Sequence, residues 1–278
     1  MNTALVIDTS REVPTKLYEI YNIYPLGYIV EDSSGNKFEE RTKIQEVQTS
    51  KLLSAIKKDK KTKLLAPSIK DFVELYTYLA EEYKSLISIH SSLSTPAVIE
   101  NAIVAKKFVS DINIDIIDTP TLATSSGIFI EELAKKIPDA ENINDIRKEA
   151  IRLDKKITSC LLTKNEQFRN MCIGNTKKLS SVTSTFKPYY FYQFNHGKWN
   201  EEGKNRATKP LIEEIKKRVK EIKNLKEITQ IYFSTSRDFS RELKKILKIF
   251  SNKNVVEITP SLVSYHLIGK NSFNISYF

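Results

Sequence analysis

The stretch "LISIHSSLSTPAVIENAIVAKKFV", residues 86–109, decides the fold class. Its first five residues have the pattern of a buried strand, and the run that begins at Pro96 has the pattern of a helix. A strand followed directly by a helix is the repeating unit of a parallel α/β sheet. Between the two lies a polar cluster made of His90, Ser91, Ser92, Ser94 and Thr95.

The same alternation continues on both sides of this stretch. Strands are predicted at residues 4–10, 26–32 and 112–118, and helices at residues 13–22, 50–59, 69–83 and 122–137. This spacing predicts an N-terminal α/β domain over residues 1–150, with a doubly wound, mostly parallel sheet. The polar segment "PDAENIN", residues 138–144, marks the expected boundary.

Residues 151–278 are predicted to form a second, mixed α/β domain. The segment "KPYYFYQFNHGKWNEEG", residues 187–203, indicates a hairpin that turns at Asn195, His196 and Gly197. Other strands are expected at residues 157–163, 228–235, 254–258, 262–268 and 274–278, and helices at residues 209–222 and 237–250.

Composition limits the classes of function. The chain has 278 residues, 40% of them hydrophobic, and no apolar run approaches the roughly 18 residues that span a bilayer. The N-terminus lacks the pattern of a signal peptide, so we expect a cytoplasmic protein. Cys160 and Cys172 do not form a Cys-x-x-Cys pair, and reduced core residues are the simplest interpretation.

Three polar segments are expected at the carboxyl ends of parallel strands, where ligands bind in such sheets. They are Asp8–Ser10, His90–Thr95 and Asp118–Gly127. Taken singly, Thr9, Ser94 and Thr121 are typical helix caps. Taken together, a rim of hydroxyl groups suits an oxyanion.

Other chemistries find less support in the residues. The set Ser92, Asp118 and His266 has the chain order of an α/β-hydrolase triad, but no Gly-x-Ser-x-Gly turn surrounds the serine. Nucleotide-binding glycine loops are absent from a chain with 7 glycines, and the 3 histidines are too far apart for a metal motif. His196 reads as a turn residue. The alternative from another class is single-stranded nucleic-acid binding, through the net charge of +10, the aromatic run at residues 189–194 and Trp199.

Several segments together resemble the DegV family of bacterial fatty-acid-binding proteins. They are "ALVIDTSREVPTKLYEIYNIYPLGYIVED", "LISIHSSLSTPAVIENAIVAKKFV", "INIDIIDTPTLATSSGIFIEELAKK", "FKPYYFYQFNHGK" and "YHLIGKNSFNISYF". The resemblance lies in their order and spacing along nearly the whole chain. It implies two domains with a lipid cleft between them, in which a fatty acid is held as ligand without any other cofactor. It also implies that a separate kinase phosphorylates the carboxylate, so that the carrier itself is no enzyme.

Site residues follow from this resemblance position by position. The family's serine pair falls on Ser91 and Ser92, and its C-terminal histidine on His266. Thr9, Ser94 and Thr121 are further candidates at the rim, whereas Leu64 and Leu65 replace family hydroxyls and are expected to line the channel. Lys204 and Arg206 retain part of a basic stretch for the partner kinase. No metal, no nucleic acid and no membrane insertion are expected, although a transient contact with a membrane surface is compatible with lipid transfer.

The energetics fit a lipid ligand. Burying a 16-carbon chain contributes on the order of 10 kcal/mol of gross transfer free energy at ~0.8 kcal/mol per methylene. The carboxylate is the costly part, because a buried charge without donors is strongly disfavoured. The sequence therefore predicts polar donors at one end of an apolar cleft.

Overall fold

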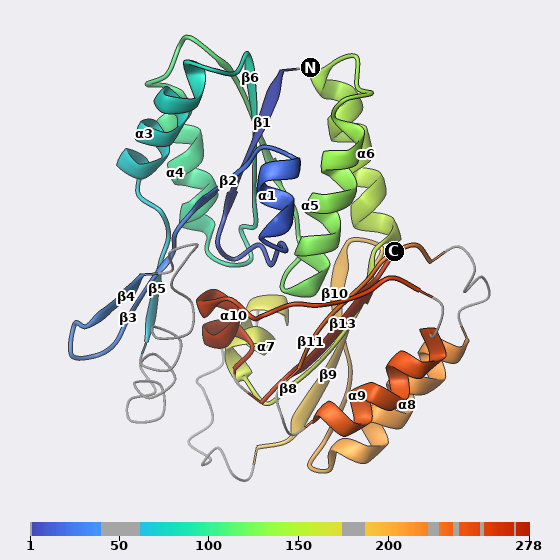
Figure 1. Cartoon of the computed structure of the whole chain (residues 1–278). Helices are drawn as coiled ribbons and strands as arrows, with labels where there is room; N and C mark the ends of the chain where they lie inside the picture. The colour runs from blue at the N-terminus through green and yellow to red at the C-terminus, as the bar shows by residue number, and fades with distance from the viewer. Residues whose placement is uncertain are drawn as a thin grey trace.

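The computed structural model describes residues 2–39, 62–173, 187–221, 228–235, 239–250, 253–269 and 271–278. Figure 1 shows an N-terminal sheet flanked by helices, a second sheet below it, and a small sheet that projects to one side. The helix expected at residues 50–59 lies outside the described residues.

The N-terminal sheet is four-stranded and entirely parallel, as expected. Its strands are β1 (Thr3–Asp8), β2 (Ile23–Leu26), β6 (Ser85–His90) and β7 (Asn113–Asp118), in the order β2-β1-β6-β7. All six residues of β1 are buried, as is typical of a strand covered on both faces. The carboxyl ends of β1, β6 and β7 therefore lie side by side.

Helices cover both faces of this sheet. They are α1 (Lys16–Ile20), α3 (Ile69–Ala80), α4 (Pro96–Lys106), α5 (Thr124–Lys136) and α6 (Ile143–Lys156). Figure 1 shows α3 and α4 on one side and α5 and α6 on the other. Local sequence sets where they begin: Ser68 and Asp71 form a capping box at the start of α3, and Pro96 occupies the first turn of α4.

The second sheet has six strands and is mixed. Its order is β10-β9-β8-β13-β11-β12, with one parallel pair, β11 and β12, and antiparallel pairing elsewhere. The strands are β8 (Thr158–Thr163), β9 (Tyr189–Asn195), β10 (Lys198–Asn205), β11 (Ile231–Thr235), β12 (Val255–Glu257) and β13 (Phe273–Tyr277). The helices of this part are α7 (Glu166–Ile173), α8 (Thr208–Lys220), α9 (Ser240–Leu247), a 3-10 turn (Lys248–Phe250) and α10 (Leu262–Leu267).

The β9–β10 hairpin turns where the sequence predicts. His196 and Gly197 connect the two strands with φ values of 48° and 74°. Two successive residues with positive φ match the right-handed twist of a hairpin, which favours Gly at the second position. His196 is therefore a turn residue.

Helix α5 joins the two sheets. Thr124 donates its backbone N–H to Asn274 Oδ1 at 3.0 Å, and its hydroxyl lies 2.7 Å from Ser276 Oγ, both on β13. A Cβ atom on Gly127 would lie 2.1 Å from the carbonyl oxygen of Glu12 and 2.9 Å from the ring of Tyr232. Only glycine allows the β1–α1 segment and β11 to approach the helix this closely.

The strand predicted at residues 26–32 is misplaced. The edge strand that pairs with β1 in the parallel sheet is residues 23–26. Most of the predicted segment instead contributes β3 (Ile29–Glu31) to a separate antiparallel sheet. That sheet has the order β4-β3-β5, with β4 (Lys37–Glu39) and β5 (Lys63–Leu65). Val30 is fully buried there against Leu262, which explains why the apolar segment leaves the parallel sheet.

The segment predicted as a strand at residues 262–268 forms the helix α10. Ser261 caps it, because its hydroxyl accepts the backbone N–H of Ser264 at 3.0 Å. The β-branched and aromatic residues of "LVSYHLI" favoured the strand prediction, but the cap decides the local structure.

The division into domains at residues 1–150 and 151–278 stays a proposal. Residue 150 lies inside α6, which continues to Lys156 and leads directly into β8. One apolar core also runs from the parallel sheet onto a face of the second sheet, through residues such as Phe129, Leu161 and Tyr232. The end of α6 is therefore the better boundary.

Candidate functional site

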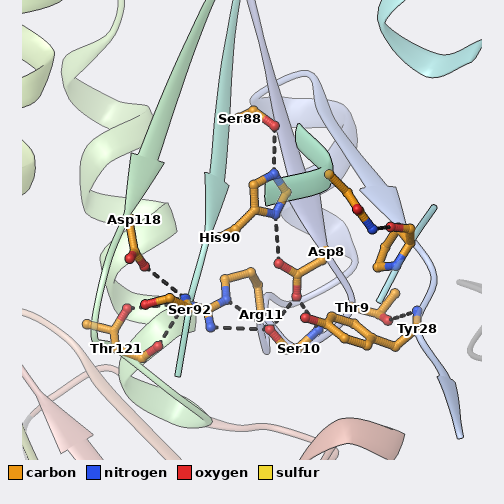
Figure 2. A network of polar contacts seen from close by, with 12 residues as sticks. Asp8, Thr9, Ser10, Arg11, Tyr28, Ser88, His90, Ser92, Asp118 and Thr121 are labelled. Carbon is orange, nitrogen blue, oxygen red and sulfur yellow. Dashed lines mark hydrogen bonds and ion pairs between the residues drawn. The ribbon is translucent and has the colours of Figure 1, made fainter. Parts of the chain in front are cut away.

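The three polar segments predicted at the carboxyl edge of the parallel sheet meet there, as Figure 2 shows. Asp8 at the end of β1 accepts a hydrogen bond from His90 at the end of β6, with 2.7 Å between Oδ2 and Nδ1. Arg11 after β1 donates from Nη1 to the backbone oxygen of Thr121, after β7, at 2.7 Å. Parallel strands in adjacent register bring these residues to one place.

A chain of hydrogen bonds runs from α3 through β6 to Asp8. Tyr76 donates its hydroxyl to Ser88 Oγ at 2.7 Å, and Ser88 Oγ lies 2.6 Å from His90 Nε2. His90, Ser88 and Asp8 are all 0% exposed. Their order is that of a Ser-His-Asp triad. The serine, however, lies inside a buried strand and already accepts a hydrogen bond from the Tyr76 hydroxyl. The set is therefore a structural network, in which no substrate reaches Ser88.

The hydrogen-bond network continues from Asp8 through Ser10 to Arg11. The second oxygen of Asp8 accepts the backbone N–H of Ser10 at 2.9 Å and the Ser10 hydroxyl, and Ser10 Oγ in turn accepts Arg11 Nε at 3.3 Å and Nη2 at 3.2 Å. Burial would raise the pKa of Asp8, but the His90 hydrogen bond and the charge of Arg11 outweigh it and hold the pKa below its ordinary value. Asp8 is therefore an ionised partner for a buried guanidinium.

Buried polar atoms without a partner lie at the same edge of the sheet as Arg11. Among the described residues, five buried polar side-chain atoms have no hydrogen-bond partner, and four of them belong to residues at this edge. These four are Glu12 Oε2, Tyr28 OH, Ser91 Oγ and Ser94 Oγ. Unpaired buried polar atoms are rare in proteins and point to a missing partner. Figure 2 shows the Tyr28 ring beside Thr9 and Ser10, on the same side as Arg11.

A cavity of about 380 Å³ opens beside this cluster, between the β1–α1 segment and the loop from β12 to α10. Thr9, Arg11, Glu12 and Ser261 line its buried end, and Lys16 and Glu257 are exposed at its mouth. Glu12 Oε1 accepts the backbone N–H of Ser261 at 3.3 Å. Burial raises the pKa of Glu12 to about 7, against the hydrogen bonds from Ser264 and Ser261 and the charge of Arg11.

Asp118 and Asp154 are also close enough to act electrostatically on the guanidinium. Asp154 accepts the Thr119 hydroxyl at 2.7 Å, and burial raises the pKa of Asp154 to about 6, with Asp118 adding to the rise and Arg11 opposing it. Arg11 is thus the cation that several carboxylates share. The site therefore combines a buried guanidinium with two carboxyl groups, Glu12 and Asp154, whose pKa values burial raises.

The predicted site residues lie as follows. Ser91 is buried and unpartnered, and Ser92 is partly exposed and donates its backbone N–H to Asp118 Oδ1 at 2.9 Å. His266, on α10, has Nδ1 2.9 Å from the hydroxyl of Thr62, which precedes β5. Burial lowers the pKa of His266 to about 4, so its imidazole is neutral at pH 7. Within the described part of the chain, no hydrogen bond joins Ser92, Asp118 and His266 into a triad.

The two leucines lie on β5 beside α10. Leu64 packs against the cluster of Val30 and Leu262, and both Leu64 and Leu65 are partly buried. Lys204 and Arg206 are exposed, at the end of β10 and just after it. Both lie in the second part of the chain, at the end of the strand that forms the edge of its sheet.

The interpretation of three hydroxyls as helix caps is wrong. Thr9 Oγ1 accepts the backbone N–H of Tyr28 at 3.0 Å, which ties β1 to the start of the small sheet. Thr121 Oγ1 lies 3.0 Å from Thr119 Oγ1, and Ser94 Oγ has no partner. The residues that do precede α4 and α5 are Thr95 and Ala123, and neither makes a side-chain cap.

Sequence reasoning missed Arg11 and Tyr28 as parts of this site, and it placed His90 in a polar segment without assigning it a role. Arg11 follows a buried strand and an aspartate, and that position is the signal that could have identified it. His90 ends β6 directly before the serines, but only the structure shows that its partner is Asp8. Tyr28 is separated from the edge in sequence and carried no signal.

The aromatic side chains that the nucleic-acid alternative requires for base stacking are buried. Five aromatic residues of the predicted stacking surface on β9, together with Trp199, are buried and pack on one another or on helices. Bases cannot stack on rings that form the core of the sheet.

Cys160 and Cys172 are free thiols, and the described residues contain no group of three or more side chains suited to a metal ion. None of the described helices is long and apolar enough to span a bilayer.

Comparison with known proteins gives a consistent result. Residues 2–277 match the family model described as "Uncharacterised protein, DegV family COG1307". A DegV domain-containing protein of Staphylococcus aureus, SA1258, is 22% identical over 270 residues, which are 94% of each chain.

Solved structures share the fold over the whole chain. DegV of Bacillus subtilis, described as a fatty acid binding protein, superposes with a TM-score of 0.80 at 18% identity and covers 100% of this chain and 99% of its own. A stearic acid-binding protein of Eubacterium ventriosum gives 0.80 at 14% identity, with 99% and 97% covered. At these identities the likeness establishes the architecture.

Proposed function

The chain belongs to the DegV family, and on that premise we propose that it binds one long-chain fatty acid with its carboxylate at the carboxyl edge of the parallel sheet. The observation that carries the proposal is the set of unpartnered buried hydroxyls, on Tyr28, Ser91 and Ser94, at the same edge of the sheet as the buried guanidinium of Arg11. Solved relatives described as fatty-acid-binding proteins share the fold and support the choice of ligand.

The chemistry of the site suits a carboxylate. A guanidinium has five N–H donors, and the observed bonds of Arg11 to Ser10 and Thr121 use at most four. At least one donor remains for an anion, and the unpartnered hydroxyls add more. Hydrogen bonds to a charged group contribute about 1.5 to 3 kcal/mol each, which offsets the cost of burying the carboxylate.

We assign supporting roles to the other predicted residues. Ser92 and His266 complete the head-group site in this proposal: the neutral imidazole of His266 keeps Nε2 for the ligand while Nδ1 faces Thr62. Thr9 and Thr121 hold the segments that carry Tyr28 and Arg11. Leu64 and Leu65 contact the acyl chain, because their apolar side chains offer no hydrogen bond.

The acyl chain is proposed to lie between the two domains, near α10 and the small sheet. The polar cavity beside Glu12 connects the head-group end with solvent, through the residues Thr9 and Arg11 that belong to both. This arrangement buries the hydrocarbon, as sequestration of a fatty acid requires, and gives the carboxylate a route to solvent through the cavity.

We further propose that the chain presents the bound carboxylate to a separate kinase in the cytoplasm and has no turnover alone. Lys204 and Arg206 are exposed cations available for such a partner. Acyl phosphate that forms only when a fatty acid kinase and ATP are added supports this step. Acyl phosphate that forms with ATP alone contradicts it.

Titration of delipidated protein with oleate by calorimetry tests the binding site. We expect one site per chain, and affinity 5- to 150-fold weaker in Ser91→Ala, Ser92→Ala and His266→Ala, which is the loss of about 1 to 3 kcal/mol per donor. Ser110→Ala, which removes an exposed hydroxyl bonded to Asp111, is the matched control and leaves affinity unchanged. Equal affinity in all four variants contradicts the proposed head-group site.

A further inference from the structure

A buried hydrogen-bond network lies behind the proposed head-group site. It runs from Tyr76 through Ser88, His90, Asp8 and Ser10 to Arg11, across three segments of the chain. Every side chain in it is buried. A buried polar network of this length is costly unless each member is satisfied. Here each link has a donor and an acceptor, and the last member is the guanidinium at the proposed carboxylate site.

The direction of each hydrogen bond follows from its chemistry. Asp8 is ionised, because its pKa lies below the ordinary value, and therefore only accepts. His90 Nδ1 must then carry the proton and donate to Asp8 Oδ2. The Ser10 hydroxyl donates to Asp8 Oδ1, so the lone pairs of Ser10 Oγ face Arg11 Nε and Nη2.

We propose that His90 is a positioning residue for the bound carboxylate: its Nδ1–H fixes the Asp8 carboxylate, which orients Ser10 and through it the guanidinium of Arg11. The inference rests on the proposed function, in which Arg11 receives the head group. It assigns to His90 an effect on the choice between an anionic and a neutral head group, although His90 is 0% exposed and does not touch the ligand.

The geometry explains why the effect passes through Asp8. Without the His90 donor, Asp8 Oδ2 loses its hydrogen bond, and the carboxylate can rotate toward Arg11 itself. A direct pair between Asp8 and Arg11 would consume the guanidinium donors that the ligand needs. The imidazole therefore prevents a direct ion pair between Asp8 and Arg11, and the two groups stay linked through Ser10.

Two substitutions at position 90 separate the two nitrogens. His90→Asn places an amide N–H near the position of Nδ1 and retains the donor to Asp8, whereas His90→Gln places its amide near Nε2, toward Ser88. Both remove the ring and its edge contact with Phe72, so both perturb packing to a similar extent. Ser10→Ala breaks the next link, and Tyr76→Phe breaks the link farthest from Arg11.

The readout is the ratio of affinities for oleate and oleyl alcohol, which share the acyl chain. We expect His90→Gln and Ser10→Ala to lower the preference for oleate about 10-fold or more, and His90→Asn and Tyr76→Phe to change it less than about 3-fold. A ratio that stays constant in His90→Gln, with both affinities lowered equally, overturns the inference and leaves a packing role only.

A measurement without ligand keeps this test apart from that of the proposed function. Hydrogen exchange of the Arg11 Nε–H, followed by NMR, should be slow in the wild type and in His90→Asn and about 10-fold faster in His90→Gln. Equal exchange in the two variants overturns the positioning role. A wild-type chain that binds neither ligand overturns the proposed function instead, whatever the exchange rates are.

Discussion

Asp8 on β1 and His90 on β6 are joined by a hydrogen bond of 2.7 Å, and neither side chain is exposed to solvent. The pair links adjacent strands at the edge where three polar segments meet. It also links the stability of the sheet to the orientation of Arg11, because Asp8 is the shared acceptor. Changes at this pair are therefore expected to affect both folding and binding.

Asp8→Asn should be strongly destabilising. It removes the negative charge that compensates Arg11 in the interior, and a buried charge without its partner costs about 3 to 5 kcal/mol. Glu74→Gln is the control, because Glu74 pairs with Lys70 with 64% and 81% of their side chains exposed, and such pairs contribute about 0 to 1 kcal/mol. Urea unfolding measures both variants. Equal losses of stability would show that the buried pair contributes no more to stability than an exposed ion pair.

Glu12 makes the stability depend on pH in a defined direction. Its pKa is about 7 in the fold, against an ordinary 4.5, so between these values the folded chain retains a proton that the unfolded chain has released. The free energy of unfolding therefore falls through this group as pH rises from 4.5 to 7. The free energy of unfolding of Glu12→Gln, measured relative to that of the wild type, should therefore rise by roughly 1 to 3 kcal/mol between pH 5 and pH 8. Parallel stability curves for the two proteins would contradict this expectation.

Gly127→Ala should disrupt the contact between α5 and its neighbours. The new methyl group would lie 2.1 Å from the backbone oxygen of Glu12, and backbone atoms move at a higher cost than side-chain ends. We expect a loss of about 3 kcal/mol, at the upper end of the range for overpacking. In Gly203→Ala the nearest atom is Leu211 Cδ2 at 3.5 Å, so that variant should lose less than about 1 kcal/mol. Thermal unfolding of the pair distinguishes the two, and similar midpoints would refute the close approach.

Ser91→Ala and Ser94→Ala should separate stability from binding. Both hydroxyls are buried without a partner, so their removal takes nothing from the ligand-free fold and leaves its unfolding free energy unchanged or higher. Fatty-acid affinity should fall in the same variants. Ser125→Ala is the comparison, because the Ser125 hydroxyl donates to the backbone oxygen of Leu122 at 2.6 Å and its loss should destabilise the protein. Ligand-free variants at 91 and 94 that lose as much stability as this one would indicate that the hydroxyls serve the fold.

The sequence predicts the fold wherever one signal dominates. The β6–α4 unit combines an apolar strand with a proline at the start of a helix, and the hairpin at His196 and Gly197 has a turn that few residues allow. Predictions failed where local propensity and tertiary contacts compete. Residues 262–267 have strand-forming side chains but a serine cap, and Val30 leaves the parallel sheet to bury itself against Leu262.

The candidate site is predictable in place but not in its chemistry. The tendency of ligands to bind at strand ends places Ser91 and Thr121 at one edge from the amino-acid pattern alone. The position of Arg11 after a buried strand and an aspartate marks it as a candidate, but nothing local predicts its hydrogen bonds to Ser10 and Thr121. The pairing of Arg11 with Thr121 joins segments about 110 residues apart, and sequence patterns do not encode such distances.

Native mass spectrometry of the purified protein is the sharpest test of fatty-acid binding. We expect a substantial share of the chains to carry the mass of one fatty acid, gentle activation to release it, and the delipidated chain to take up oleate again at one molecule per chain. Arg11→Met, purified under conditions in which it is folded, should carry less bound lipid than the wild type. A chain that is free of lipid as purified, and that stays free after incubation with oleate, would contradict the proposal that it binds fatty acids.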